Sequence, residues 1–173
     1  MTKEEIRAIS LSKMRLKRDS TVWDIGAGTG AVSIEAALYC NKGRVYAVEK
    51  KQEARELIRQ NAGAFGVGNL IIVPGEAAEV ILELPEPDRV FIGGTGDMME
   101  DIFEIVTERI SKGGIIVVNS ITLETAYFAQ KFLACRGFEV ETILVSIAAS
   151  KKAGGKTMML ARNPVYIITA VKV

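Results

Sequence analysis

Short apolar runs alternate with segments of helical periodicity along most of this chain, and that alternation restricts the folds open to it. Five apolar runs are each followed by a helix-like segment. We expect strands over residues 21–25, 44–48, 69–73, 89–92 and 115–118, and helices over residues 31–39, 52–64, 76–82, 98–110 and 123–135. Strands that alternate with helices form an open, mostly parallel α/β sheet with right-handed crossovers.

The pattern changes after Gly137. Residues 138–147 and 165–171 are two strand-like runs without a helix between them, and residues 149–156 separate them with a sequence too polar and glycine-rich for a core element. We expect these two runs to close a seven-stranded sheet as an antiparallel hairpin. At the other end, Thr2-Lys3-Glu4-Glu5 has the form of a capping box and predicts a short helix over residues 2–18. We expect one domain over residues 1–173.

Charge and composition exclude several classes of function. Twenty-two basic residues face 21 acidic ones, so no net field would attract nucleic acid or anionic lipid. The chain has no histidine, which excludes a histidine base, a Ser-His triad and any histidine metal site, and we predict no metal site. We expect Cys40 and Cys135 to be buried, reduced thiols. With no signal peptide and no apolar run of ~18 residues, the protein is expected to be cytoplasmic.

The first strand ends in a glycine-rich loop, Gly26-Ala27-Gly28-Thr29-Gly30. Glycines at these positions allow a ligand to approach the backbone closely. The loop leads into a helix N-terminus, whose free N–H groups favour negative charge. Gly26-x-Gly28-x-x-Ala31 also satisfies a dinucleotide-binding pattern, so the loop alone leaves both a nicotinamide dinucleotide and S-adenosylmethionine open.

Three features favour S-adenosylmethionine. Asp24 lies two residues before the first glycine, where a carboxylate suits an ammonium group or the loop amides but repels a pyrophosphate. Gly30 gives the Gly-x-Gly-x-Gly spacing, and Gly75-Glu76-Ala77 follows the third strand, where methyltransferases place a segment beside the adenine. The sequence therefore predicts a Rossmann-like class I S-adenosylmethionine-dependent methyltransferase. Its cofactor-binding half would span residues 19–95, and its acceptor half, with the closing hairpin, residues 96–173.

Two carboxylates near the loop are candidate cofactor ligands. Glu49 ends the second strand and could accept hydrogen bonds from both ribose hydroxyls, or it could be a solvated carboxylate at a strand end. Glu76 could contact the cofactor. It could instead stabilise the N-terminus of the following helix, leaving the adenine contact to the backbone amide of Ala77.

Several segments outside the cofactor loop resemble one family. They are Thr2-Lys3-Glu4-Glu5-Ile6-Arg7, Phe91-Ile92-Gly93-Gly94-Thr95-Gly96, Asn119-Ser120-Ile121-Thr122-Leu123-Glu124-Thr125 and Thr157-Met158-Met159-Leu160-Ala161-Arg162-Asn163-Pro164-Val165. Together they resemble the CbiT family of decarboxylating cobalt-precorrin-6B C15-methyltransferases of cobalamin biosynthesis, which is also found as one half of the fused CobL enzymes. The resemblance covers essentially the whole chain, including loops.

The resemblance implies roles for individual residues. Gly26 to Gly30 match the family's cofactor loop, Glu49 stands where many members have Asp, and Ala77 matches the adenine-side position. Thr2 matches a threonine close to the cofactor, a role that competes with helix capping. Family members usually carry a further N-terminal stretch before this threonine.

The implied substrate is a flexible tetrapyrrole that carries acetate and propionate carboxylates. Lys151, Lys152, Lys156 and Arg162 lie around the predicted hairpin loop and could bind these carboxylates, although such lysines are also common on solvated loops. Arg162 is a candidate catalytic residue. Met158 and Met159 could line the macrocycle or a subunit interface.

Neither implied chemical step requires histidine. Methyl transfer mostly requires in-line positioning, and the conjugated macrocycle can act as electron sink for the loss of carbon dioxide. Gly93, Gly94 and Thr95 follow the fourth strand, where methyltransferases place the acceptor; we expect Gly93 on the cofactor side, Gly94 on the substrate side and Thr95 in catalysis. Asn119 could orient a substrate carbonyl or carboxylate. Thr122 could contact the substrate or cap the next helix.

The sequence also leads to expectations about the protein's partners and about alternative functions. The apolar hairpin suggests an oligomer, the resemblance points to a homotetramer, and the chain is too short to include a C5-methyltransferase, which would be a separate protein. A methyltransferase of the same fold could act on another small molecule, RNA or protein, although a macromolecule would require a larger basic face. A non-catalytic S-adenosylmethionine-binding module and a nicotinamide oxidoreductase are the remaining alternatives.

Overall fold

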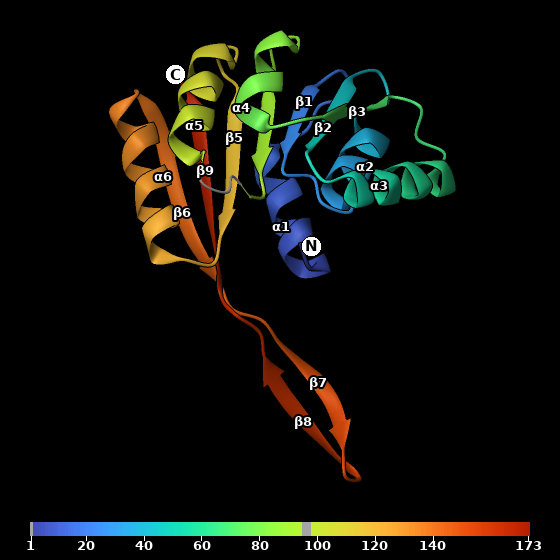
Figure 1. The fold of residues 1–173 in the computed structure, drawn as a ribbon. Coiled ribbons are helices and arrows are strands. Elements are labelled where there is room, and N and C mark those ends of the chain that lie inside the picture. Colours follow the sequence, from blue (N-terminus) through green and yellow to red (C-terminus); the bar gives the residue numbers. More distant parts are fainter. Residues whose placement is uncertain (1, 95–97) are drawn as a thin grey trace.

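The computed structural model describes residues 2–94 and 98–173, and its centre is one seven-stranded sheet with the strand order β3-β2-β1-β4-β5-β9-β6. Its strands are β1 (Thr21–Ile25), β2 (Arg44–Glu49), β3 (Leu70–Pro74), β4 (Arg89–Ile92), β5 (Ile115–Ser120), β6 (Phe138–Val145) and β9 (Val165–Lys172). β1 to β5 pair in parallel, and β9 is inserted antiparallel between β5 and β6 (Figure 1). The predicted mostly parallel sheet with a C-terminal antiparallel hairpin is confirmed.

Helices cover both faces of this sheet (Figure 1). They are α1 (Glu4–Met14), α2 (Ala31–Tyr39), α3 (Gln52–Phe65), α4 (Ala77–Val80), the 3-10 helix η1 (Ile81–Glu83), α5 (Met99–Arg109) and α6 (Leu123–Cys135). Alternate residues of β1 separate the two cores: Trp23 packs with the α4, α5 and α6 side, whereas Val22 packs with α1 and α2. Burial on both faces explains why the strands read as continuous apolar runs. None of the helices in the described part of the chain is long and apolar enough to span a membrane.

Residues 148–161 form an arm that projects from the body of the molecule (Figure 1). Its strands, β7 (Ala148–Ala153) and β8 (Lys156–Ala161), pair with each other and not with the central sheet. Residues 149–156 are outside the core, as the sequence indicated, but they were expected as the loop of the hairpin and instead belong to a β-ribbon whose turn lies at Gly154 and Gly155. Every residue of β8 is exposed, so the ribbon lacks the buried face from which sequence patterns reveal a strand.

Two further predictions were wrong. The N-cap of α1 is Lys3 and makes no side-chain cap bond, so Thr2 does not form the predicted capping box, and the helix runs from Glu4 to Met14 instead of over 2–18. Cys40 is buried as expected, but Cys135 is exposed because it lies on the solvent side of the last turn of α6.

Candidate functional site

A cleft of about 60 Å³ lies where β1 runs into its glycine loop. The residues that line it come from the N-terminal segment, the β1 loop, the start of α2 and the end of β4: Thr2, Asp24, Gly26, Ala27, Gly28, Thr29, Ala31, Val32, Phe91 and Gly93. Seven of these are predicted cofactor ligands, so residues far apart in the sequence meet at one place. The cleft is at the carboxyl edge of the sheet, where open α/β proteins bind ligands.

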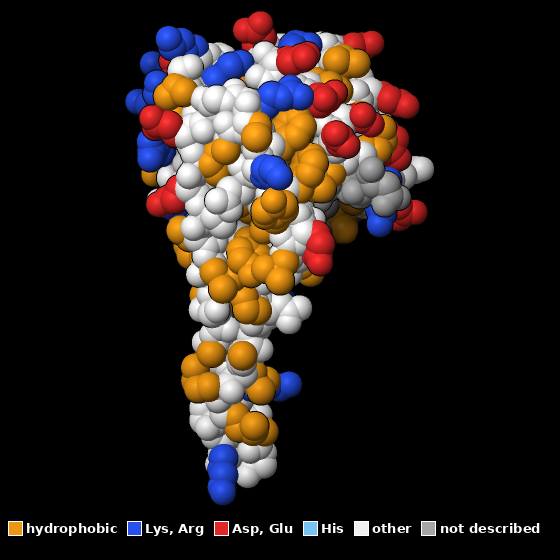
Figure 2. All heavy atoms as spheres, turned by 90° about the vertical axis from the view of Figure 1, so that its left-hand side faces the viewer, with side chains coloured by type: hydrophobic (Ala, Val, Ile, Leu, Met, Phe, Trp, Pro, Cys, Tyr) orange, Lys and Arg blue, Asp and Glu red, His pale blue; other side chains and the backbone are white. Residues whose placement is uncertain are grey.

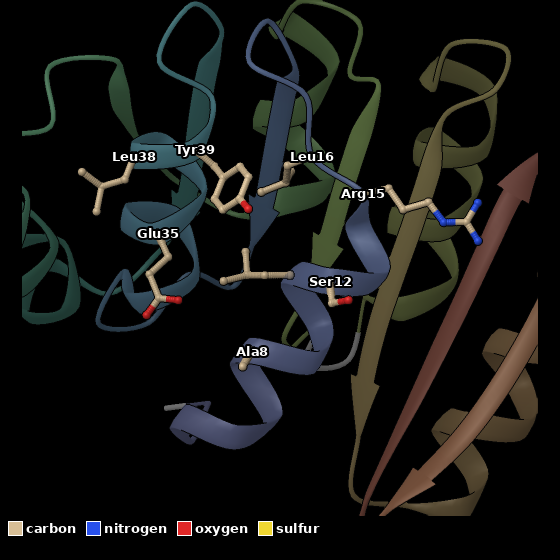
Figure 3. Close-up of a pocket in the computed structure, with 8 residues that line it drawn as sticks. Ala8, Ser12, Arg15, Leu16, Glu35, Leu38 and Tyr39 are labelled. Atoms are coloured by element: carbon tan, nitrogen blue, oxygen red, sulfur yellow. The ribbon is translucent and has the colours of Figure 1, made fainter.

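A larger hollow, of about 580 Å³, lies between α1 and α2 (Figure 3). It is lined by Leu11, Leu16, Leu38 and Tyr39 together with a few polar side chains. This hollow contains none of the predicted site residues. We place the candidate site at the smaller cleft because backbone amides and a buried carboxylate converge there, and such polar groups orient a ligand.

The glycine loop is shaped by two different requirements. Gly26 has a φ of +75°, and a Cβ there would lie 2.5 Å from the carbonyl oxygen of Gly94, so glycine is needed for the β1 and β4 loops to pack together. Gly28 has a φ of +58°, and a Cβ there would have no described atom within 4 Å. The space beside Gly28 is therefore open to a ligand that approaches the backbone.

Asp24 supplies a buried carboxylate to the cleft. Only 1% of its surface is exposed, and Oδ2 accepts a hydrogen bond from Oγ of Ser33, which lies in the first turn of α2. Within the described residues, Oδ1 has no hydrogen-bond partner. Burial raises the pKa of Asp24 to about 6, against the opposing effect of the Ser33 hydrogen bonds. An unpaired, buried carboxylate oxygen is an acceptor suited to a cationic donor such as an ammonium group.

Glu49 fastens the glycine loop to the end of β2. Its Oε2 accepts a hydrogen bond of 2.9 Å from the amide of Gly28, and its Oε1 accepts one of 2.9 Å from the amide of Lys51. Glu49 is 9% exposed, so the alternative of a solvated carboxylate is wrong. Each carboxylate oxygen has more than one lone pair, so these amides leave Glu49 able to accept hydrogen bonds from a ligand as well.

Gly75, Glu76 and Ala77 follow β3, beside the end of β2, since Glu49 is in register with Pro74. Glu76 is the N-cap residue of α4 and makes no side-chain cap bond; it forms a 3.1 Å ion pair with Lys50. The three residues do not line the cleft. They extend the same edge of the sheet beyond Glu49, and their cofactor contacts stay predictions.

The predicted acceptor residues lie at the ends of β4 and β5. Gly93 lines the cleft and Gly94 packs behind Gly26, while Thr95 lies outside the described residues. The side-chain amide of Asn119 hydrogen-bonds the hydroxyl of Ser10, with distances of 3.1 Å to Oδ1 and 2.9 Å to Nδ2.

Thr122 is the N-cap of α6, where its hydroxyl oxygen accepts a 3.4 Å hydrogen bond from the amide of Thr125. The capping alternative is thus observed for Thr122. A contact of Thr122 with substrate stays a prediction.

The predicted substrate-binding residues of the hairpin, which are its cations and Met158, divide into two groups. Lys151, Lys156 and Met158 are exposed on the arm and are not part of the cleft. Arg162 lies at the base of the arm, where its Nη1 forms a 2.6 Å ion pair with Oε2 of Glu5 on α1. The sequence did not indicate that Glu5 contacts Arg162, that Ser10 contacts Asn119 or that Ser33 contacts Asp24. Each of these contacts joins residues that are distant in the chain or that are brought together only by tertiary packing.

Comparison with known proteins agrees with this geometry. A family model described as precorrin methyltransferase domain matches residues 1–172. A protein of Pyrobaculum aerophilum named a probable cobalt-precorrin-6B C(15)-methyltransferase (decarboxylating) is 45% identical over 172 residues, covering 98% of this chain and 88% of the relative.

Solved structures give the same result. A structure from Geobacter metallireducens titled precorrin-6y C5,15-methyltransferase has a TM-score of 0.95 and 44% identity, with 99% of this chain and 91% of the other covered. A structure from Methanobacterium thermoautotrophicum titled precorrin 8W decarboxylase has a TM-score of 0.92 and 32% identity, with 98% and 91% covered. This chain belongs to the precorrin methyltransferase family.

Proposed function

We propose that this protein is an S-adenosylmethionine-dependent methyltransferase of cobalamin biosynthesis. Its substrate would be a tetrapyrrole like cobalt-precorrin-6B, which it methylates at carbon 15 with loss of carbon dioxide from an acetate side chain. The relatives' names support the reaction. The observation that carries the proposal is the cleft itself, which is lined by a glycine backbone and by the buried carboxylate of Asp24, one of whose oxygens has no hydrogen-bond partner among the described residues.

The residues at the cleft fit S-adenosylmethionine, which supplies an electrophilic methyl group when bound. Asp24 would bind the ammonium group through Oδ1, and the backbone of Gly26 to Gly30, with Thr2 and Gly93, would enclose the methionine portion. Glu49 would bind the ribose, and Gly75, Glu76 and Ala77 would border the adenine. The unpaired Asp24 oxygen argues against a nicotinamide dinucleotide, because its negative charge would repel the pyrophosphate.

The acceptor side would orient the substrate without a histidine. Gly94 has no Cβ to obstruct a flat macrocycle, and Thr95 and Asn119 would position its reacting edge. Arg162, Lys151 and Lys156 would bind its carboxylates, and Thr122 and Met158 would contact its rim. Holding the carbon in line with the donor is the main contribution required of the protein, since the conjugated substrate can accept the electron pair left by decarboxylation.

The assembly we propose is a homotetramer of single-domain chains spanning residues 1–173, located in the cytoplasm. Exposed apolar side chains continue from the body onto the arm (Figure 2). They include Ile121, Leu123 and Tyr127 on or beside α6, Leu144 on β6, and Met158, Met159 and Leu160 on β8. An isolated two-stranded ribbon is marginally stable in water, so packing against other copies would stabilise the arm. Methylation of carbon 5 would belong to a separate protein.

The reaction can be tested by mass spectrometry. Incubation with S-adenosylmethionine and cobalt-precorrin-6B is expected to give a product heavier by one methyl group and lighter by one carbon dioxide. Omitting the methyl donor is the control. An unchanged tetrapyrrole mass with a folded protein that binds S-adenosylhomocysteine would contradict the substrate and favour a methyltransferase with another acceptor.

A further inference from the structure

Helix α1 is tied to the rest of the molecule by polar side-chain contacts with four different parts of the fold. Arg7 pairs with Glu35 on α2, Ser10 with Asn119 on β5, Lys13 with Glu141 on β6, and Glu5 with Arg162 beside the arm. The helix also buries Ile6 and Met14 against the sheet. These contacts fix both ends of α1 in place.

The start of α1 lies at the cleft. Thr2 lines the cleft, precedes the N-cap residue Lys3, and is held by a 3.3 Å hydrogen bond from Nη1 of Arg7 to its carbonyl oxygen. Glu5 is in the first turn of the helix, three residues after Thr2. Because Thr2 is joined to the first turn through Lys3 alone and is hydrogen-bonded to Arg7 of the helix, the position of that turn constrains where Thr2 meets the cleft.

Arg162 connects this first turn to the base of the arm. Its backbone amide donates a 2.8 Å hydrogen bond to the carbonyl oxygen of Ile147, which closes the ribbon where it leaves the sheet. Its guanidinium reaches Glu5 at 2.6 Å, and both side chains are about two-fifths exposed. The negative carboxylate of Glu5 is also favoured by the free amides of the helix N-terminus. Its pKa is lowered, first by a backbone hydrogen bond and then by the charge of Arg162.

We propose that the Glu5–Arg162 ion pair is a positioning contact that sets the affinity for the methyl donor. It would do so by holding the first turn of α1, and with it Thr2, against the cleft. The inference rests on the proposed function, because it requires that the donor binds at this cleft. It gives Arg162 a role through Glu5 and the cofactor site, distinct from direct contact with a substrate carboxylate.

Titration of the full chain with S-adenosylhomocysteine tests this role. Glu5→Gln and Arg162→Gln are each expected to raise the Kd about three- to fivefold, in line with the worth of a half-exposed ion pair. The double variant should bind as weakly as either single one, because both remove the same contact. Arg162→Lys retains the charge and should bind close to the wild type. In Glu5→Gln, the KM for S-adenosylmethionine should rise with kcat unchanged.

Glu4→Gln is the matched control. It removes the same charge from the same helical turn, but Glu4 is exposed and makes no ion pair with any described residue. Its Kd should equal that of the wild type, and the thermal midpoints of all variants should lie close together.

The outcomes distinguish a failure of the proposed function from a failure of the positioning role. A wild-type protein that does not bind S-adenosylhomocysteine would overturn the proposed function itself. If the wild type binds and Glu5→Gln and Arg162→Gln bind equally well, the positioning role is wrong. It is also wrong if Arg162→Gln raises only the KM for the tetrapyrrole, which would indicate direct substrate contact.

Discussion

Asp24 combines two properties that rarely occur together: it is fully buried, and one of its carboxylate oxygens lacks a partner among the described residues. Burying an incompletely paired carboxylate costs free energy, which is why its pKa rises to about 6 from an ordinary value of 3.8. A bound ammonium group would supply the missing partner and favour the ionised form. We therefore expect a bound cation to stabilise the ionised form of Asp24.

This gives a prediction for pH dependence. The folded apoprotein binds more protons than the unfolded chain between pH 3.8 and about 6, so its stability should fall as pH rises through that window and then level off. Asp24→Asn should remove this fall and stabilise the apoprotein at pH 7 by up to about 3 kcal/mol. Urea unfolding of both proteins at pH 4.5 and pH 7 measures the effect.

The same substitution should weaken binding. S-Adenosylhomocysteine affinity of the wild type should rise from about pH 5 to about pH 7 as Asp24 ionises, whereas Asp24→Asn should bind weakly at both values. A wild-type affinity that stays constant over this range would show that the Asp24 carboxylate does not hold the ammonium group.

Sequence reasoning identified the residues in and beside the cleft more completely than the residues that hold them in place. Asp24, Gly26 to Gly30 and Glu49 could be predicted because they are consecutive or lie at strand ends, where a local pattern carries the information. Three supporting contacts could not be predicted: those of Ser33 with Asp24, Ser10 with Asn119 and Glu5 with Arg162. Contacts between residues that are distant in the chain leave no periodic pattern in the sequence. Thr2 was assigned two competing roles, and the structure removes one by starting α1 after it.

At the scale of elements, the arm is the part that the sequence did not predict. The strands of the central sheet are visible in the sequence because burial on one or both faces selects apolar side chains. The backbone hydrogen bonds of β7 and β8 join these two strands to each other, and nearly all of their residues are exposed, so neither face of the ribbon is buried. A ribbon without a buried face carries a weak signal in its own sequence.

The proposed assembly leads to an element-scale prediction. Replacing Met158 and Met159, which are 51% and 65% exposed, by serine should convert the tetramer to smaller species, because it removes apolar surface that subunit contacts would bury. Analytical ultracentrifugation at micromolar concentration measures the change. Leu82→Ser is the matched control, since Leu82 is 54% exposed on η1, in the body of the protein outside the arm. A wild-type protein that sediments as a monomer would contradict the tetramer.

At the scale of the whole molecule, the strand order explains the position of the cleft. From β1 the chain first adds β2 and β3 on one side and then places β4 and β5 on the other, so the order reverses between β1 and β4. Open α/β sheets bind ligands at such a reversal, in the crevice at the carboxyl ends of the strands. Gly26 and Gly93 lie on these two loops, and both line the cleft. We therefore expect the fold to determine where a ligand binds, and side chains such as Asp24 to determine which ligand binds.

Calorimetric titration of the full chain with S-adenosylhomocysteine and, separately, with NAD tests whether this cleft binds the methyl donor. The arrangement of Asp24 and the glycine loop predicts one S-adenosylhomocysteine site per chain and no measurable NAD binding, because the carboxylate attracts an ammonium group and repels a pyrophosphate. Tight binding of NAD without binding of S-adenosylhomocysteine would contradict the account.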